Sequence, residues 1–201
     1  MVSRKSIAVE LSRLKSLDSH KLELEQYETG SEIASILLWH AYMRGDISNK
    51  TVADLGAGNG ILGIGALMLG AKHVTFLEKD IDAVNIMSKN LSEYEEDCYN
   101  VMHSDISKYN SIVDTVIMNP PFGAQIRHAD APFINAALSY ANKSYIIIPP
   151  VSLDYYKKAV GETHSLTVLD TLKYRMPKHY DHQKKITAII EVMIIVINKQ
   201  S

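Results

Sequence analysis

The tetrapeptide Asn119-Pro120-Pro121-Phe122 carries the most specific chemistry in the sequence, and it ends an apolar run abruptly. An aromatic amine is a poor nucleophile because its lone pair is delocalised into the ring. Two acceptors, the Asn119 side-chain oxygen and the Pro120 carbonyl, would draw the hydrogens of such an amine and favour its pyramidal, attacking form. The prolines stiffen the turn and remove competing donors, and Phe122 offers a ring for stacking a base. The tetrapeptide therefore predicts chemistry at an exocyclic amino or amide nitrogen.

A glycine-rich turn, Asp54-Leu55-Gly56-Ala57-Gly58-Asn59-Gly60, lies between a predicted strand and a predicted helix. Glycines there permit a tight turn and bring the backbone close to a ligand beside the helix N-terminus. The spacing of Gly58, Gly60 and Gly63 also satisfies the dinucleotide fingerprint. The glycines alone therefore leave NAD and S-adenosylmethionine open, with a purely structural turn as the third interpretation.

Two acidic residues follow the next two predicted strands. Glu78 comes about 20 residues after Gly56, the spacing at which an acid accepts hydrogen bonds from ribose hydroxyls in a nucleoside-binding βαβ unit. Asp105 would accept from an adenine amino group, although Ser104-Asp105 is equally typical of a turn or a helix cap. A solvated surface charge is the alternative for Glu78.

A basic stretch near the C-terminus, Lys173 to Lys185, predicts a local contact with nucleic acid. It holds five basic residues against one acid, with aromatic residues interleaved, which suits phosphate contact and base stacking. Lys184 and Lys185 are the predicted phosphate contacts, with Arg127 and His128 as a second substrate-binding pair. An ordinary solvated loop is the alternative. No metal site is predicted, because the histidines of this stretch have no cysteine nearby and only the single acid Asp181 beside them.

Strands and helices alternate along the chain, which predicts a parallel sheet with helices on both faces. Thr29-Gly30-Ser31-Glu32 is typical of a capping box that opens a helix. The last two strands have no helix between them, so we expect an antiparallel hairpin. Strands are predicted at Thr51–Leu55, His73–Leu77, Asn100–His103, Val113–Met118, Tyr145–Ile148, Ser165–Leu172 and Thr187–Ile197. Helices are predicted at Ile7–Leu17, from Ser31 through Tyr42, and at Ile61–Leu69, Ile81–Tyr94, Ala131–Ala141 and Leu153–Val160.

Length and composition limit the class of protein. The 201 residues suit a single domain, and 46% apolar with 22% charged residues is an ordinary globular composition. A net charge of −2 gives no global attraction for nucleic acid. Cys98 is the only cysteine, which excludes an internal disulfide and fits a reducing cytoplasm. The longest apolar stretch, Thr187 to Ile197, is too short to cross a membrane.

The glycine turn and the tetrapeptide together resemble those of class I S-adenosylmethionine-dependent methyltransferases. From about Leu24 the chain is similar to the small archaeal and eukaryotic rRNA adenine-N6 methyltransferases, the methyltransferase-like protein five group. Three stretches carry this similarity: Leu24 to Thr29, Val116 to Gly123, and Leu172 to Pro177. The resemblance implies an α/β Rossmann-like fold, with a seven-stranded, mostly parallel sheet and an antiparallel C-terminal hairpin. Residues 1–201 would form one methyltransferase domain, in which 1–28 are an N-terminal helix and a cofactor-covering segment and 29–201 the catalytic core.

The resemblance also implies roles for individual residues and partners. Those that would hold S-adenosylmethionine are Gln26, Thr29, Asp54, Gly56, Gly58, Asn59, Gly60, Ile61, Glu78 and Asp105, and Asn119 to Phe122 would carry the catalysis. The substrate would be adenine N6 in structured RNA, especially small-subunit rRNA. A small zinc-ribbon activator protein is the implied partner.

Four other functions stay open at this point. Guanine N2 of RNA and the amide of a protein glutamine share the same chemistry. A nicotinamide oxidoreductase would leave Asn119 to Phe122 unexplained, and a non-catalytic RNA-binding scaffold would transfer no methyl group.

Overall fold

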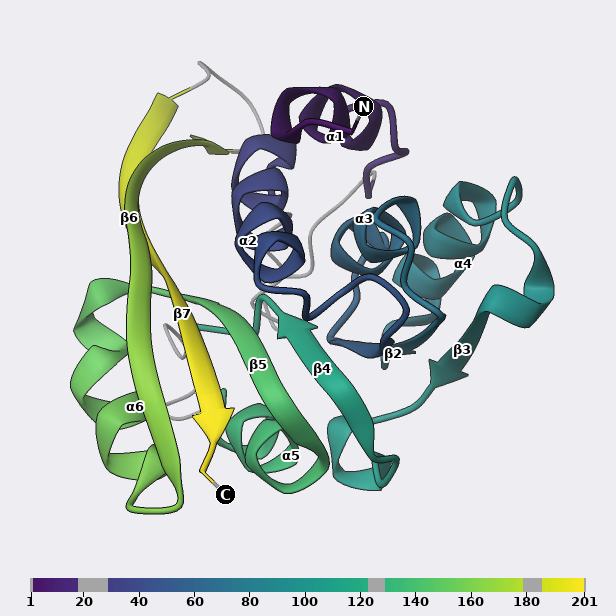
Figure 1. Cartoon of the computed structure of the whole chain (residues 1–201). Helices are drawn as coiled ribbons and strands as arrows, with labels where there is room; N and C mark the ends of the chain where they lie inside the picture. Colours follow the sequence, from purple (N-terminus) through teal and green to yellow (C-terminus); the bar gives the residue numbers. More distant parts are fainter. Residues whose placement is uncertain (1, 18–28, 123–128, 179–185, 201) are drawn as a thin grey trace.

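A computed structural model describes residues 2–17, 29–122, 129–178 and 186–200, with side chains omitted at 174–178 and 186–189. Its sheet has seven strands in the order β3-β2-β1-β4-β5-β7-β6 (Figure 1). The strands are β1 (Thr51–Leu55), β2 (His73–Glu78), β3 (Tyr99–His103), β4 (Val113–Met118), β5 (Ala141–Ile148), β6 (His164–Lys178) and β7 (Ile186–Lys199). Strands β1 to β5 pair in parallel, and β7 pairs antiparallel with both β5 and β6. The predicted sheet and its C-terminal hairpin are confirmed.

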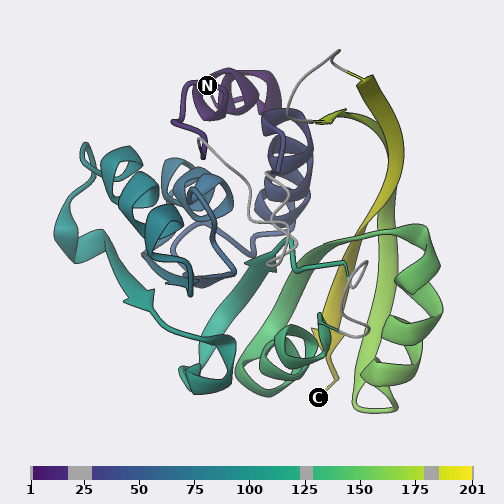
Figure 2. The same cartoon turned by 180° about the vertical axis from the view of Figure 1, so that it is seen from behind.

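Six α-helices cover the two faces of this sheet (Figures 1 and 2). They are α1 (Arg4–Leu11), α2 (Ser31–Met43), α3 (Ile61–Met68), α4 (Ile81–Asn90), α5 (Ala131–Tyr140) and α6 (Leu153–Val160). Short 3-10 turns precede β3, β4 and α6, namely η2 (Glu96–Cys98), η3 (Ile106–Lys108) and η4 (Pro150–Ser152). In the part of the chain that the structure describes, no helix is long and apolar enough to span a membrane.

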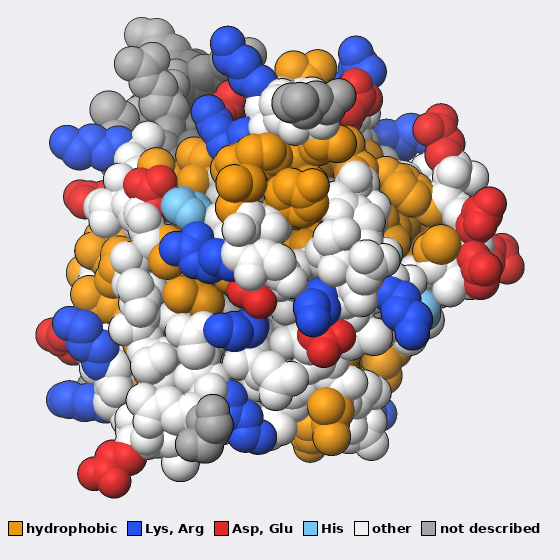
Figure 3. Space-filling view, viewed as in Figure 1, with side chains coloured by type: hydrophobic (Ala, Val, Ile, Leu, Met, Phe, Trp, Pro, Cys, Tyr) orange, Lys and Arg blue, Asp and Glu red, His pale blue; other side chains and the backbone are white. Residues whose placement is uncertain are grey.

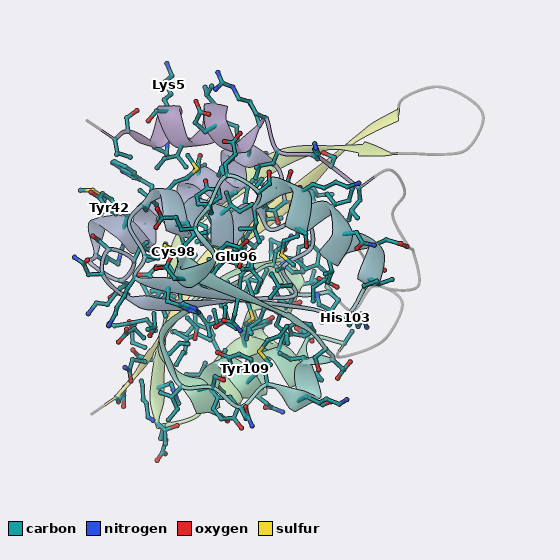
Figure 4. All side chains as sticks on the ribbon, turned by 90° about the vertical axis from the view of Figure 1, so that its right-hand side faces the viewer. Lys5, Tyr42, Glu96, Cys98, His103 and Tyr109 are labelled. Atoms are coloured by element: carbon teal, nitrogen blue, oxygen red, sulfur yellow. The ribbon has the colours of Figure 1, made fainter. Side chains whose placement is uncertain are left out.

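Successive residues of a strand belong to two separate hydrophobic clusters, one on each face of the sheet. Val52 packs with residues of α1 to α4 in one cluster, whereas its neighbour Ala53 packs with residues of α5 and α6 in the other. Figure 4 shows the two layers, with Lys5 on the side of α1 and Tyr109 on the opposite side. Because a strand directs alternate side chains to opposite faces, both faces of the central strands contribute to an apolar cluster, as is typical of parallel strands covered on both sides.

Three helix boundaries differ from the prediction by three or more residues. Helix α1 begins at Arg4, because the Ser3 side chain accepts from the Ser6 N–H and Ser6 returns the contact in a capping box, and it ends at Leu11 rather than Leu17. Helix α4 ends at Asn90 instead of Tyr94. The capping box predicted at Thr29 to Glu32 is wrong, since Gly30 is the N-cap of α2 and no side chain caps it.

The face of the molecule that carries α1 and α2 mixes apolar and charged side chains (Figure 3). Figure 3 shows hydrophobic side chains gathered in its upper part, and Lys and Arg interspersed with Asp and Glu below them. Val9 and Met43 are among the exposed apolar residues of these helices. This face therefore offers no continuous positive surface for nucleic acid.

Candidate functional site

Two of the predicted motifs, the glycine turn and the Asn119 tetrapeptide, lie at the carboxyl ends of β1 and β4. These strands are neighbours, and Asp54 pairs with Ile117 near the ends of both. The chain order reverses here, because β2 follows on one side of β1 while β4 lies on its other side. Open α/β sheets bind their ligands at such a switch point. The glycine turn after β1 and Asn119 after β4 both lie at this edge.

The glycine turn has a backbone that other residues would adopt only with strain. Gly56, Gly58 and Gly60 have φ angles of 74°, 57° and 87°, in the left-handed region where a Cβ is unfavourable. Gly60 is the N-cap of α3, and a Cβ there would lie 2.9 Å from Cγ of Met87. A Cβ at Gly63 would collide with the Phe76 ring. The N–H groups of Gly56, Gly58 and Gly60 are bonded within the protein, so the glycines serve to hold this tight turn and to let a ligand approach its backbone closely.

The Glu78 carboxylate holds this turn in place. Its Oε2 accepts from the Gly58 N–H at 2.8 Å, and its Oε1 accepts from the N–H groups of Lys79 and Asp80 at 2.9 Å each. The side chain is buried, with 8% exposure. A carboxylate has about four lone-pair sites, so these three bonds leave capacity for about one further donor. Glu78 therefore combines a structural role with room for a ligand hydroxyl.

Asp54 is a buried acid below the turn. Its Oδ2 accepts from the Gly63 N–H at 2.7 Å, whereas Oδ1 is buried without a hydrogen-bond partner among the described residues. Burial, and to a smaller extent the nearby Glu78 charge, raise the pKa of Asp54 to about 7, although the Gly63 bond lowers it. A cation placed near this turn would favour the ionised carboxylate.

The raised pKa of Asp54 makes folding depend on pH. The folded pKa of about 7 lies above the ordinary value of 3.8, so stability is fully present below pH 3.8 and is lost as pH rises through about 7. Urea unfolding of the ligand-free protein at pH 5 and pH 8 should show a loss of roughly 2–3 kcal/mol from this group. Asp54→Asn should remove most of that difference. An equal pH dependence in both proteins would show that Asp54 is ionised in the fold.

Asn59 fastens the N-terminal segment to the turn. Its Oδ1 accepts from the Ile61 N–H at 3.2 Å, and its Nδ2 donates to the Lys15 carbonyl at 3.2 Å. Asn90 adds to this attachment, because its Oδ1 accepts from the Lys15 N–H at 2.9 Å and its Nδ2 donates to the carbonyls of Lys15 and Asn59. Sequence reasoning missed Asn90, since an asparagine at a helix end is ordinary and its partner lies 75 positions away.

Asn119 is held by a residue that is distant in the sequence. Its Nδ2 donates to the Thr29 hydroxyl at 2.9 Å. Pro120 is buried, Pro121 and Phe122 are half-buried, and Phe122 packs against the α1–α4 cluster. The tetrapeptide is therefore held in place by the Thr29 hydroxyl and by the packing of Phe122.

The remaining predicted residues divide into two groups. Asp105 is exposed and caps η3 by accepting from the Ser107 N–H at 3.0 Å, and bonds from Ser107 hold its pKa below its ordinary value. It follows β3 beside Glu78, whose carbonyl accepts from the Ser104 N–H at 2.9 Å. Gln26, Arg127, His128, Lys184 and Lys185 lie outside the described residues.

One group of metal-ligand type occurs within the described ranges, and it is remote from this edge. Glu95, Asp97 and Cys98 lie at η2, before the first residue of β3. In Figure 4, Cys98 and His103 mark the two ends of that strand. The group therefore sits at the amino end of the sheet, away from Glu78.

Comparisons with known proteins show the family and the fold of this chain. A model of the family described as the methyltransferase small domain matches residues 28–144. The Danio rerio protein named rRNA N(6)-adenosine-methyltransferase METTL5 is 34% identical over 193 residues, which cover 92% of this chain and 93% of that protein. The Drosophila melanogaster protein named rRNA N(6)-adenosine-methyltransferase Mettl5 is 33% identical and covers 90% of each chain. A crystal structure described as a candidate RNA methyltransferase from Pyrococcus horikoshii superposes with a TM-score of 0.91, at 42% identity over 99% of this chain and 98% of that one.

Proposed function

This chain belongs to the methyltransferase small domain family, and from that membership we propose that it methylates adenine N6 in ribosomal RNA, with S-adenosylmethionine as the donor. One observation carries the proposal. The amide of Asn119 is held at the carboxyl end of β4, beside the glycine turn that follows β1. The choice of adenine N6 and rRNA is supported by the names of the zebrafish and fruit-fly relatives.

The residues at the sheet edge fit the proposed cofactor. The left-handed glycine turn lets a ligand approach its backbone, and Glu78 has capacity for a ribose hydroxyl. The buried Oδ1 of Asp54 favours a positively charged ligand nearby. Asp54, Gly56, Gly58, Asn59, Gly60, Ile61 and Glu78 would hold the cofactor, with Gln26, Thr29 and Asp105 completing the set that the resemblance implies.

When bound, the cofactor supplies an electrophilic methyl group on a cationic sulfonium. Asn119 Oδ1 and the Pro120 carbonyl would accept hydrogen bonds from the target amine and localise its lone pair for attack. Phe122 would stack on the base that is turned out of the RNA. Because these groups act by position and by fixed dipoles, the site needs no general base to raise the reactivity of the amine, and the displaced proton passes to water.

RNA recognition must come from a local surface, since the net charge is −2. We assign it to the stretch from Lys173 to Lys185 that includes the connection between β6 and β7. An A-form or looped RNA would be recognised there by its backbone and shape. The zinc-ribbon activator stays a prediction of the resemblance, and the cytoplasmic location stays a prediction from the single cysteine.

Charge reversal at this connection tests the interaction with RNA. Lys184→Glu combined with Lys185→Glu should weaken RNA binding and reduce its salt dependence, by about 0.7–0.9 log units per log unit of salt for each phosphate that is no longer neutralised. Binding must be measured over a salt series, because one salt concentration does not separate the removal of phosphate neutralisation from general repulsion. Cofactor affinity and melting temperature should stay at wild-type values. An unchanged salt slope would move the RNA surface to Arg127 and His128.

Transfer of a labelled methyl group tests the function itself. Ribosomal subunits, naked rRNA and a protein extract are offered in parallel, and the labelled products are digested for nucleoside mass spectrometry. We expect N6-methyladenosine in rRNA. Label at guanine N2 or in protein glutamine would identify that group as the substrate in place of adenine N6. Absence of transfer with retained RNA binding would indicate a non-catalytic RNA-binding scaffold. Tight binding of NADH without any transfer would indicate an oxidoreductase.

A further inference from the structure

The hydrogen bond between Asn119 and Thr29 joins residues 90 positions apart. We propose that Thr29 is a positioning residue for methyl transfer, whose hydroxyl orients the Asn119 amide so that Oδ1 faces the target amine. The resemblance implies only a cofactor contact for Thr29. The predicted capping box would have placed its hydroxyl on the backbone N–H groups at the start of α2. The proposal rests on the function proposed above.

An asparagine amide needs such support because its last torsion is soft. The χ2 angle of asparagine has broad, roughly two-fold preferences, and a half-turn exchanges the oxygen and the nitrogen at nearly equal volume. An amide turned the wrong way would present an N–H donor to the N–H donors of the target. In the structure Nδ2 donates to the Thr29 hydroxyl at 2.9 Å. This bond holds the amide plane and leaves the oxygen on the other branch of that plane, where an amine can donate to it.

Both partners are fixed to rigid elements. Thr29 immediately precedes Gly30, the N-cap of α2, and α2 is anchored by fully buried Leu37 and Leu38. An ion pair at 3.2 Å between Arg4 and Glu32 also connects α1 to α2. On the other side, Asn119 lies between the central strand β4 and buried Pro120. The hydrogen bond therefore connects two fixed points, so the orientation is set before the substrate arrives.

The first test is a double-mutant cycle in single-turnover methyl transfer. Thr29→Val keeps the shape and removes the acceptor, and it should lower the rate about 5- to 10-fold, the scale of one neutral hydrogen bond. Thr29→Ser should restore most of the rate. In the Asn119→Ala background Thr29→Val should have no further effect. Thr167→Val, at an exposed position of β6, is the matched control and should keep the wild-type rate.

The cycle separates this proposal from its rivals. A merely structural role of Thr29 would lower the rate to the same extent with and without Asn119. Thr29 also belongs to the residues that would hold the cofactor, so the rates are measured at saturating S-adenosylmethionine, where a change in its affinity does not contribute. An equal loss of rate with and without Asn119 would overturn the proposal, as would a wild-type rate in Thr29→Val. The proposed function fails by a different result, namely absence of methyl transfer by the unmodified protein.

The second test measures the hydrogen bond without using activity. Selective ¹⁵N labelling of asparagine gives side-chain amide signals, and the one missing in Asn119→Ala identifies Asn119. Its amide protons should exchange with water at least about 10-fold more slowly in wild type than in Thr29→Val, because the bonded donor is protected. Thr29→Ser should keep this protection. Equal exchange in wild type and Thr29→Val would overturn the proposal, whatever the rates show.

Discussion

Asn119→Ala should lower the single-turnover rate of methyl transfer about 100-fold or more, the scale on which one preorganised dipole stabilises a transition state. Alanine removes the oxygen that accepts from the target amine, and the Pro120 carbonyl then acts alone. The effect should exceed that of Thr29→Val, which disturbs the orientation of the amide but keeps its oxygen. Rates are measured with saturating RNA and cofactor, so that binding does not limit them.

Cofactor affinity separates this interpretation from a general loss of structure. Asn119 follows β4 on the substrate side of the tetrapeptide, so Asn119→Ala should bind S-adenosylmethionine as wild type does. Asn110→Ala is the matched control, because Asn110 is exposed in the connection before β4, and it should keep the wild-type rate. A rate near wild type in Asn119→Ala would refute the mechanism.

Glu78→Ala should weaken S-adenosylmethionine binding by roughly 1.5–3 kcal/mol, the scale of hydrogen bonds to a charged group, or about 10- to 150-fold in Kd. The loss has two physical sources. The ribose loses its acceptor, and the glycine turn loses the carboxylate that accepts from the Gly58 N–H at 2.8 Å. Isothermal calorimetry measures the change directly.

The same substitution should also reduce the free energy of unfolding of the ligand-free protein. The N–H groups of Gly58, Lys79 and Asp80 lose a shared acceptor, and burial of an unpaired donor is costly. Glu96→Ala, which removes an exposed carboxylate of η2, is the matched control and should change neither quantity. Unchanged S-adenosylmethionine affinity in a folded Glu78→Ala protein would remove Glu78 from the cofactor site.

The local pattern of the sequence determined the elements and their order. The sequences of β4 and β5 lack a polar alternation, which is typical of a strand covered on both faces. The glycine turn and the tetrapeptide could be placed at one edge of the sheet, since the carboxyl ends of parallel strands share an edge. The ends of α1 and α4 were less predictable, because a helix boundary depends on the interactions of single residues such as Ser3.

Only the tertiary structure decided which partners the site residues have. Thr29 has the sequence context of a helix cap, yet its hydroxyl accepts from Asn119, because the fold brings the start of α2 to the residue that follows β4. Asn90 is ordinary in the sequence but binds the backbone of Lys15. The raised pKa of Asp54 comes from its burial, which depends on every element packed around it. Local sterics determine helices and strands, whereas side-chain partners 75 or 90 positions apart depend on the topology that brings them together.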